Sequence, residues 1–495
     1  MIDAEVIVGL EVHCQLNTKS KLFCGCSTDY RDDGPNTHVC PICLGLPGTM
    51  PALNRRAIEY AMKVAKALNC TVIPESEFSR KNYFYPDLDK AYQITQYDKP
   101  LAQGGYVEIE GDDGKERKIQ LTRIHIEEDP GRLVHMGNAE RGRYSLVDYN
   151  RAGVPLIEIV SEPDMRSPKE ARKFLNKLRA TLEYLGVFDS EKEGSLRVDA
   201  NISLRGSERV EVKNITSYKG VEKALTFEVT RQKNLIRRGL PVERETRHYL
   251  EARGITQSAR SKETENDYRY FPEPDLRPLR VQSWVKDIAL PELPDARRER
   301  FVTQYGCSPS HARTLTGELK MANFFEAVVA DNRAELCGLA ATWIADTLAG
   351  ELNYRSMGIE AVNPEKFGGL LVLLKERTIT DKSGVEVLRE MLDAVKQQKV
   401  PEDPRTIVNR LDLWKISETG SVSSGVILPK IGSNSLDVII ENVKKANPKA
   451  VEDYRAGRKG ALNFLVGQVM KETRGKFDPS DINRYVTESL RDTPE

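Results

Sequence analysis

The chain has 495 residues, of which 30% are charged and 39% are hydrophobic. This composition excludes a disordered protein, and the length allows several domains. Lys and Arg (74) balance Asp and Glu (74), so any nucleic-acid site must be a local basic patch. No apolar run reaches the roughly 18 residues of a membrane span, and residues 1–5 lack the features of a secretory signal. We therefore expect a cytoplasmic protein without a membrane partner.

Strand and helix patterns are mixed in the first part of the chain. Apolar residues at helical spacing predict a helix at about 56–69, and a second helix begins at the capping box Ser167-Pro168-Lys169-Glu170 and stops at Gly186. Period-two alternation predicts strands at 5–16, 117–127, 143–149, 196–205 and 208–215. These elements predict an α+β domain with a largely antiparallel sheet over residues 1–291.

Strand patterns disappear after about residue 292. Helical spacing at 317–331 and 383–397 predicts a helical domain over 292–400. The proline-containing segment from Val400 to Pro404 is typical of a linker. It leads into a predicted all-helical tail domain over 401–495, with helices at 434–446, 448–456, 460–473 and 479–491.

Three predicted strands each carry one polar face. In the first strand, Glu11, His13 and Gln15 alternate with apolar residues. The other two polar faces consist of Arg197, Asp199, Asn201, Ser203 and Arg205, and of Arg123, His125 and Glu127, with Glu128 next along the chain. For any single strand, a solvated outer face of the sheet is the simpler interpretation.

The three polar faces together also fit a phosphoryl-transfer site. Convergent carboxylates favour a hard cation such as Mg²⁺, which takes oxygen ligands beside phosphate. Arg123, Arg197 and Lys213 would then meet phosphate oxygens. The sequence has no G-x-x-x-x-G-K-[ST] loop and no G-x-G-x-x-G after a strand, so ATP would need a different cradle.

Four of the eight cysteines form two close pairs. Cys24 and Cys26 are followed by Cys40 and Cys43 in a C-x-C…C-x2-C arrangement, in a predicted zinc loop at 24–43. Two such pairs can close a tetrahedral Zn²⁺ site, and four thiolates leave no open position, so the predicted role is structural. Unligated thiols are the alternative.

The stretch from Val147 to Ile159, VDYNRAGVPLIEI, is similar to a signature of the B subunits of the aspartyl/glutamyl-tRNA amidotransferases. The resemblance covers essentially the whole chain, and the large inserted domain of the related archaeal E subunits is missing. Other matching blocks begin at Gly9, Arg80, Tyr92, Asp199, Glu211, Asp267, Asp453 and Phe464.

The resemblance implies a carbon–nitrogen ligase with glutamine as amido donor. ATP would phosphorylate the side-chain carboxylate of misacylated Asp-tRNA(Asn) or Glu-tRNA(Gln), and ammonia would displace the phosphate. An amidase, known as the A subunit, would supply the ammonia, and the small C subunit would complete a heterotrimer. The tail domain would bind the tRNA.

The resemblance also implies site residues. Those for Mg²⁺ are Glu11, His13, Glu127 and Glu128, with Asp199 as a catalytic neighbour; those for ATP are Lys81, Tyr83, Arg197 and Lys213. Glu158 lies in an apolar run and fits a buried structural acid as well as a ligand. Tyr83, Phe84 and Tyr85 fit either core packing or stacking, on the terminal adenosine of a tRNA or on ATP. A basic excess in the tail comprises Lys444, Lys445, Lys449, Arg455, Arg458, Lys459, Lys471, Arg474 and Lys476.

The segment from Leu88 to Tyr92 departs from the family pattern. The family usually has Leu-Pro-Lys-Gly-Tyr, whereas this chain has Leu-Asp-Lys-Ala-Tyr. The lost glycine predicts an altered turn.

Two other functions remain open at this stage. One is a non-catalytic zinc-dependent RNA-binding protein, which leaves the strand-face acids without a role. The other is a self-sufficient amidase that uses the Gly/Ser stretch at 420–425, although no lysine near that stretch supports a nucleophile.

Overall fold

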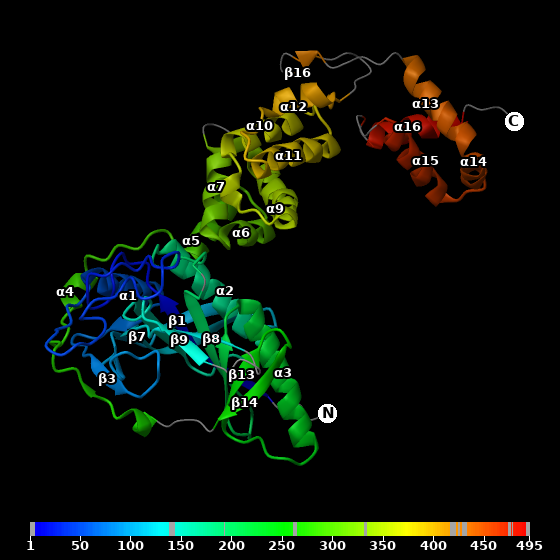
Figure 1. The fold of residues 1–495 in the computed structure, drawn as a ribbon. Helices are drawn as coiled ribbons and strands as arrows, with labels where there is room; N and C mark the ends of the chain where they lie inside the picture. Colours follow the sequence, from blue (N-terminus) through cyan, green and yellow to red (C-terminus); the bar gives the residue numbers. More distant parts are fainter. Residues whose placement is uncertain are drawn as a thin grey trace. The chain divides into compact units, whose positions relative to one another are not determined.

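The computed structural model describes residues 5–137, 144–192, 194–260, 265–330, 334–415, 422–423, 426–427, 433–473, 477 and 479–491. The chain forms two compact units, Met1–Pro294 and Asp295–Glu495 (Figure 1). Within the described residues, no helix is long and apolar enough to cross a membrane.

The first unit is built on one large sheet. Its strands pair antiparallel, apart from the parallel pair β12–β13, which confirms the largely antiparallel α+β prediction. The strand order is β14 (Ile255–Arg260), β13 (Glu245–Leu250), β12 (Val210–Ile215), β11 (Leu196–Leu204), β1 (Val6–Gln15), β10 (Pro155–Ser161), β7 (Glu116–Glu128), β5 (Ala102–Gln103) and β2 (Thr71–Val72), and β6 (Tyr106–Glu110) also pairs with β7.

The register aligns polar side chains from four strands in one row. His13 on β1 lies opposite Arg197 on β11 and opposite Glu158 on β10. Glu158 in turn lies opposite His125 on β7. One step along β1, Glu11 lies opposite Asp199. The sheet therefore brings together residues that are more than a hundred positions apart in the sequence.

The opposite face of the sheet forms the core. Val8, Leu10, Val12 and Cys14 of β1 are buried, as the alternation predicts. Helices α2 (Pro168–Tyr184) and α3 (Tyr218–Arg237) lie side by side (Figure 1). They contribute to this core together with α1 (Arg55–Ala67). Helix α2 begins as predicted, because the Ser167 side chain accepts a hydrogen bond from the Glu170 amide.

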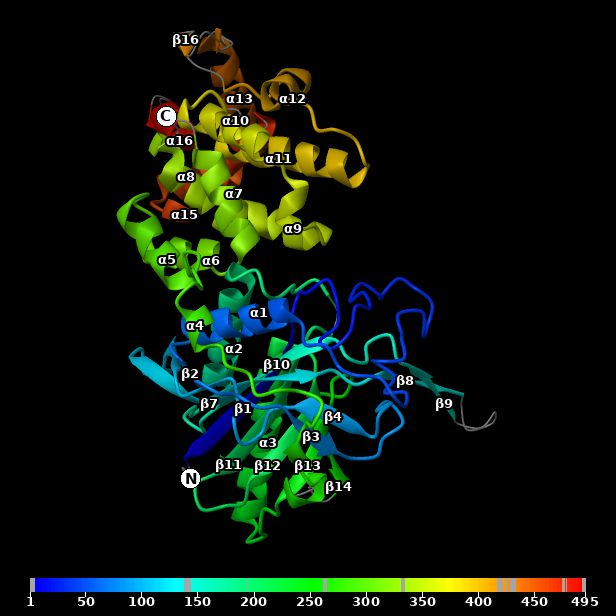
Figure 2. The same ribbon diagram turned by 90° about the vertical axis from the view of Figure 1, so that its left-hand side faces the viewer.

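A small three-stranded sheet borders the end of β7. It contains β15 (Phe271–Pro272), β3 (Ser79–Asn82) and β4 (Tyr92–Thr95), seen near β7 in Figure 2. Gln93 donates to the Glu128 carbonyl at 2.6 Å, and the Thr95 hydroxyl donates to the Glu127 carboxylate at 3.2 Å. The predicted strand at 143–149 is β9 (Tyr144–Asp148), which pairs with β8 (Arg132–Met136) outside the large sheet.

Helices dominate the described part of the second unit. The predicted helices at 317–331 and 383–397 correspond to α7 (Leu319–Val329) and α11 (Asp381–Lys396). The four tail helices are α13 (Ser433–Ala446), α14 (Pro448–Arg455), α15 (Lys459–Glu472) and α16 (Pro479–Arg491), which share a small apolar core. The tail is not wholly helical, because β16 (Val422–Ser423) pairs with β17 (Val426–Ile427). Most of the 420–425 stretch lies outside the described residues.

Candidate active site

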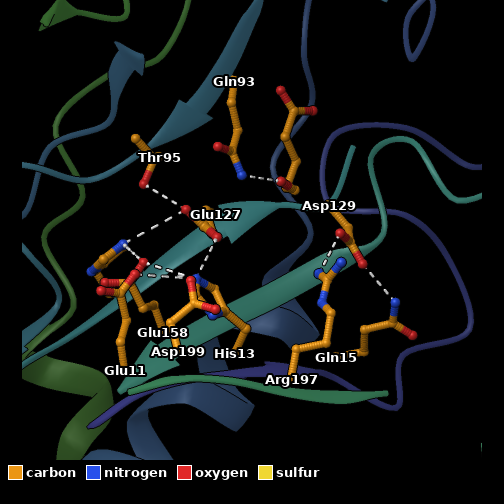
Figure 3. A network of polar contacts seen from close by, with 12 residues as sticks. Glu11, His13, Gln15, Gln93, Thr95, Glu127, Asp129, Glu158, Arg197 and Asp199 are labelled. Carbon is orange, nitrogen blue, oxygen red and sulfur yellow. Dashed lines mark hydrogen bonds and ion pairs between the residues drawn. The ribbon is translucent and has the colours of Figure 1, made fainter. Parts of the chain in front are cut away.

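Three carboxylates and two imidazoles converge on the polar face of the large sheet (Figure 3). His13 Nε2 lies 3.2 Å from Glu158 and 3.5 Å from Glu11. His125 Nε2 lies 3.4 Å from Glu158 and 3.8 Å from Glu127. Two groups of donor atoms thus form, Glu11–His13–Glu158 and His125–Glu127–Glu158, each within 4.8 Å. Glu158 belongs to both groups, which favours a ligand role over that of a purely structural acid.

The cluster is largely buried, and its charges act strongly on one another. Burial raises the pKa of Glu11 to about 7, with a further contribution from the Glu158 charge. Burial alone would lower the pKa of His13, but the hydrogen bond to Glu158 and the nearby carboxylates raise it to about 9. Burial likewise opposes ionisation of Glu158, but the charges of His125, His13 and Arg123 lower its pKa. Carboxylates at this spacing fit a divalent cation such as Mg²⁺, with imidazoles beside them.

Glu128 lies apart from this cluster. Its carboxylate accepts a hydrogen bond from Lys90 Nζ at 2.7 Å and another from the Ile94 amide at 2.9 Å. Successive side chains of a strand point to opposite faces, so Glu127 and Glu128 cannot both face the cluster. The side chains of Lys90 and Glu128 are only 7% and 5% exposed, so they form a buried ion pair.

Asp199 and Lys213 lie beside Glu11. Lys213 Nζ donates to Asp199 at 2.8 Å and lies 3.6 Å from Glu211. Burial disfavours the charged ammonium, yet Asp199 and Glu211 outweigh it and raise the pKa of Lys213. A positive charge is therefore held next to the carboxylate cluster.

Arg197 has a fixed partner of its own. Its guanidinium donates to Asp129 Oδ1 at 2.5 Å, and Gln15 donates to Asp129 Oδ2 at 2.6 Å (Figure 3). Arg151 Nε lies 3.8 Å from the same carboxylate. Asp129 is the residue here that sequence reasoning missed, because it follows the end of β7, where strand alternation no longer indicates direction.

Lys81 and Tyr83 lie in a group of aromatic side chains. Lys81 Nζ is 4.7 Å from the ring centre of Tyr268 and 5.9 Å from that of Tyr83. Burial lowers the pKa of Lys81, but electrostatic interactions with Tyr270, Glu127 and other groups raise it above its ordinary value. Lys81 therefore brings positive charge towards the carboxylates.

The aromatic run at 83–85 is not core. Phe84 is 78% exposed and Tyr85 is 52% exposed, although Tyr83 packs edge-on against Tyr268. Two exposed aromatic rings just beyond the end of β3 favour the stacking interpretation over core packing.

The four clustered cysteines come together as the spacing predicts. The Sγ atoms of Cys24, Cys26, Cys40 and Cys43 lie within 4.8 Å of one another. Buried Lys21 donates to the His38 carbonyl at 2.8 Å and contacts Cys43 Sγ at 3.6 Å. Four thiols with a neighbouring cation fit a closed Zn²⁺ site.

Comparison with known proteins shows the family to which the chain belongs. The model of the GatB/GatE catalytic domain matches residues 6–287, and that of the GatB domain matches residues 323–490. The chain is 82% identical over 493 residues to the B subunit of the aspartyl/glutamyl-tRNA(Asn/Gln) amidotransferase of Methanoregula boonei, covering 99% of both chains. It is 66% identical over 490 residues to the B subunit of Methanospirillum hungatei, again over 99% of both, and 48% identical over 515 aligned positions to that of Haloarcula marismortui, covering 98% of this chain and 97% of the relative. The chain therefore belongs to the family of aspartyl/glutamyl-tRNA(Asn/Gln) amidotransferase B subunits.

Proposed function

We propose that the chain carries the ATP-using site of a tRNA-dependent amidotransferase. The site phosphorylates the side-chain carboxylate of Asp on tRNA(Asn) or of Glu on tRNA(Gln), and the activated acid is then amidated. The observation that carries this proposal is the largely buried cluster of Glu11, His13, Glu127 and Glu158. Its family relatives are named as subunits of this enzyme.

The reaction has two displacement steps. A carboxylate oxygen attacks the γ-phosphorus of ATP, the bond from that phosphorus to the β–γ bridging oxygen breaks, and ADP leaves. Ammonia then attacks the carbonyl carbon of the acyl phosphate, the carbon–oxygen bond to phosphate breaks, and the nitrogen loses a proton. Both steps depend on positioning and charge neutralisation.

The chain's own residues supply both the positioning and the charge neutralisation. Glu11, Glu127 and Glu158, with His13 and His125, would hold Mg²⁺, which neutralises phosphate charge when bound. Lys213 and Arg123 place positive charge at two sides of this cluster. Arg197 is held by Asp129, so we assign it an orienting role rather than a primary phosphate contact. Glu128 is not proposed as a ligand, because its carboxylate is bound to Lys90.

The cysteine cluster is proposed as a structural Zn²⁺ site. Cys24, Cys26, Cys40 and Cys43 would hold the ion and fix the loop that follows β1. That strand carries Glu11 and His13, so the zinc loop supports the catalytic strand from one end.

The partners follow from the same proposal. The amidase, as the A subunit, would release ammonia from glutamine, and the small C subunit would complete a heterotrimer, in the cytoplasm. We propose 292–400 as a helical domain and 401–495 as the tRNA-binding tail, with Lys445, Lys449, Arg455, Arg458 and Lys471 as phosphate contacts. Lys444 is less suited, because it is buried and bound to Glu441 and Ser489. The side chain of Lys459, and Arg474 and Lys476, lie outside the described residues.

The exposed rings of Phe84 and Tyr85 would stack on the terminal adenosine of the tRNA. The non-catalytic RNA-binding function is not supported, because the relatives are named as amidotransferase subunits.

His13→Ala and Glu127→Ala in the assembled complex test the proposal. We expect tRNA-dependent ATP cleavage to fall by about 100-fold or more, because each change removes a group from the charge-holding cluster, while tRNA binding is kept. His135→Ala is a matched control, since His135 is an exposed imidazole bonded to Ser145. Wild-type ATP cleavage in both site variants would overturn the proposal. Transamidation of each misacylated tRNA then identifies the amino acid that is amidated.

A further inference from the structure

We propose that the ammonium group of Lys21 is the counter-ion of the zinc site and ties that site to the turn at 148–153. This inference rests on the proposed Zn²⁺ site of the cysteine cluster. Lys21 is 0% exposed and is one of the largest fully buried side chains of the described residues. A buried ammonium is stable only where acceptors and a negative charge surround it. The contacts of Lys21 therefore indicate its role.

The ammonium of Lys21 has three acceptors for its three N–H groups. Its Nζ lies 2.8 Å from the carbonyl oxygen of His38 and 3.5 Å from that of Tyr149. The third acceptor is Cys43 Sγ, at 3.6 Å. The hydrogen-bonding capacity of a charged lysine is thus matched, with one of the clustered thiols as a member of the set.

The carboxylate that shares a cavity with Lys21 is engaged elsewhere. Glu128 lines the same cavity as Lys21, but its carboxylate accepts a hydrogen bond from Lys90 at 2.7 Å. Among the described residues, no carboxylate forms an ion pair with Lys21. Because the two carbonyl oxygens carry no net charge, the negative charge that Lys21 needs comes from the thiols.

A complete Zn²⁺ site would in turn need a cation. Four thiolates carry four negative charges and Zn²⁺ carries two positive ones, so the bound ion would leave two excess negative charges among partly buried side chains. Cys43 Sγ already accepts a hydrogen bond from the Cys40 amide at 3.2 Å, and Lys21 adds a charged donor to the same sulfur. Such a donor orients the ligand atom and reduces the repulsion between the thiolates.

Lys21 also joins two segments that are far apart in the sequence. Its backbone amide donates to the Cys26 carbonyl at 3.0 Å, and the amide of Leu22 donates to the Gly153 carbonyl at 2.8 Å. Gly153 has a φ of 84°, and a Cβ built on it would lie 3.5 Å from Lys21 Cδ, so the lysine stem runs along the turn. The Gly153 amide donates to the Asp129 carbonyl at 2.9 Å. The zinc loop, the ammonium and this turn therefore form one connected unit beside the end of β7.

The zinc affinity of the assembled complex, measured by competition with a chelator of known affinity, tests the inference. Lys21→Met keeps most of the length of the side chain but removes its charge, and we expect zinc to be bound about 10- to 100-fold more weakly. Leu22→Ala is the matched control, because Leu22 is the next residue and is fully buried in the apolar core. It should destabilise the same segment but keep the zinc affinity within about two-fold of the wild type.

A charge-matched double variant separates charge from packing. Cys26→His replaces one thiolate by a neutral imidazole, which Zn²⁺ also binds, and Cys26 is only partly buried, so the larger ring can be placed. Combined with Lys21→Met, it restores the net charge of the wild-type site. We expect the double variant to bind zinc at least about ten-fold more tightly than Lys21→Met alone. A purely structural role for Lys21 would not give this recovery.

Three results would overturn the inference: wild-type zinc affinity in Lys21→Met, an equal loss of affinity in Leu22→Ala, or a double variant that binds zinc no better than Lys21→Met. If Lys21→Met alone does not fold, the double variant decides the matter, because a folded, zinc-bound complex supports the inference and an unfolded one contradicts it. Failure of the proposed zinc site is distinct, because the wild-type complex would then retain no zinc. If the wild type retains zinc and Lys21→Met binds it normally, only the role of Lys21 fails.

Discussion

The cysteine cluster and the carboxylate cluster are both candidate metal sites, yet they are built differently. The four thiols come from one loop, residues 24–43, whereas the carboxylates come from three strands spread over residues 11–158. Spacing alone therefore indicated which cysteines meet. The carboxylates that meet depend on strand register, which spacing does not give. A site built from one loop can be recognised from a sequence motif. A site built from several strands can be recognised only when the strand order and register of the sheet are known.

Loss of one thiol should have the largest effect. Structural zinc binding is worth about 10 kcal/mol or more, so Cys43→Ser should abolish zinc retention and expose residues 24–43 to proteases. Zinc content by mass spectrometry and limited proteolysis measure this. Cys70→Ser is the control, because Cys70 is a free cysteine outside the cluster. Equal zinc content in both variants would contradict a four-thiol site.

A pair of glutamate variants separates the cluster from its sequence neighbours. Glu158→Gln should reduce tRNA-dependent ATP cleavage by about 100-fold, because its carboxylate is shared by both donor groups. Glu128→Gln should keep ATP cleavage within a few-fold but lower stability by about 3 kcal/mol, since the buried side chain of Lys90 loses its ionic partner. Chemical denaturation and an ATPase assay measure the two effects. A large loss of ATP cleavage in Glu128→Gln, with little loss in Glu158→Gln, would show that Glu128 rather than Glu158 belongs to the site.

Asp89 is close enough to the Lys90–Glu128 pair and to the cysteine cluster to interact with their charges, and its own ionisation has a pH-dependent cost in stability. Burial raises its pKa to about 6, and the charges of Glu128 and Cys43 add to this, while the charge of Lys90 opposes it. The folded state therefore binds the proton more tightly than the unfolded state, whose pKa is near 3.8. Stability from this group is present at low pH and is lost as the pH rises towards and past 6.

Asp89→Asn should remove that cost. We expect a gain of about 1 kcal/mol at pH 8, allowing for solvent screening, and almost none near pH 4. Urea denaturation across this pH range measures the gain. A gain of equal size at every pH would show that the carboxylate charge is not its cause.

The smallest effect concerns Ala91, which replaces the usual glycine of the family. Its φ is 61°, in the left-handed region, so the turn adopts a conformation that suits glycine while it carries alanine. Ala91→Gly should relieve the backbone strain of the folded state, but it also raises the conformational entropy of the unfolded chain. The strain relief is the larger effect, so we expect the fold to be stabilised by about 0.5 kcal/mol. Thermal unfolding measures the shift. Ala61→Gly, in the middle of α1, should instead destabilise, and equal effects at both positions would contradict the argument.

Much of the fold could be predicted, because local patterns determine it. Alternation along β1 correctly gave the buried face, and the capping box at Ser167 gave the start of α2. Alternation along β7 already placed Glu128 opposite to Glu127. Only the family resemblance predicted that both glutamates bind the same Mg²⁺ ion. In the structure the two side chains point to opposite faces, as the alternation indicates. The direction of Glu158 could not be predicted, because both faces of β10 are largely buried and its neighbours hide the period.

The row that joins Arg197, His13, Glu158 and His125 across four strands has a consequence for how the chain can vary. The same alternation that aligns these four residues places Val12, Cys14, Ile157 and Ile159 in the core. A single-residue insertion within β1 or β10 would turn the catalytic groups into the apolar layer and bring apolar groups to the surface that holds them. Changes in length are therefore confined to the turns between strands. The strand register that buries the apolar side chains is therefore the same register that brings the polar side chains of the site together. A chain that has folded with this core has also assembled the site.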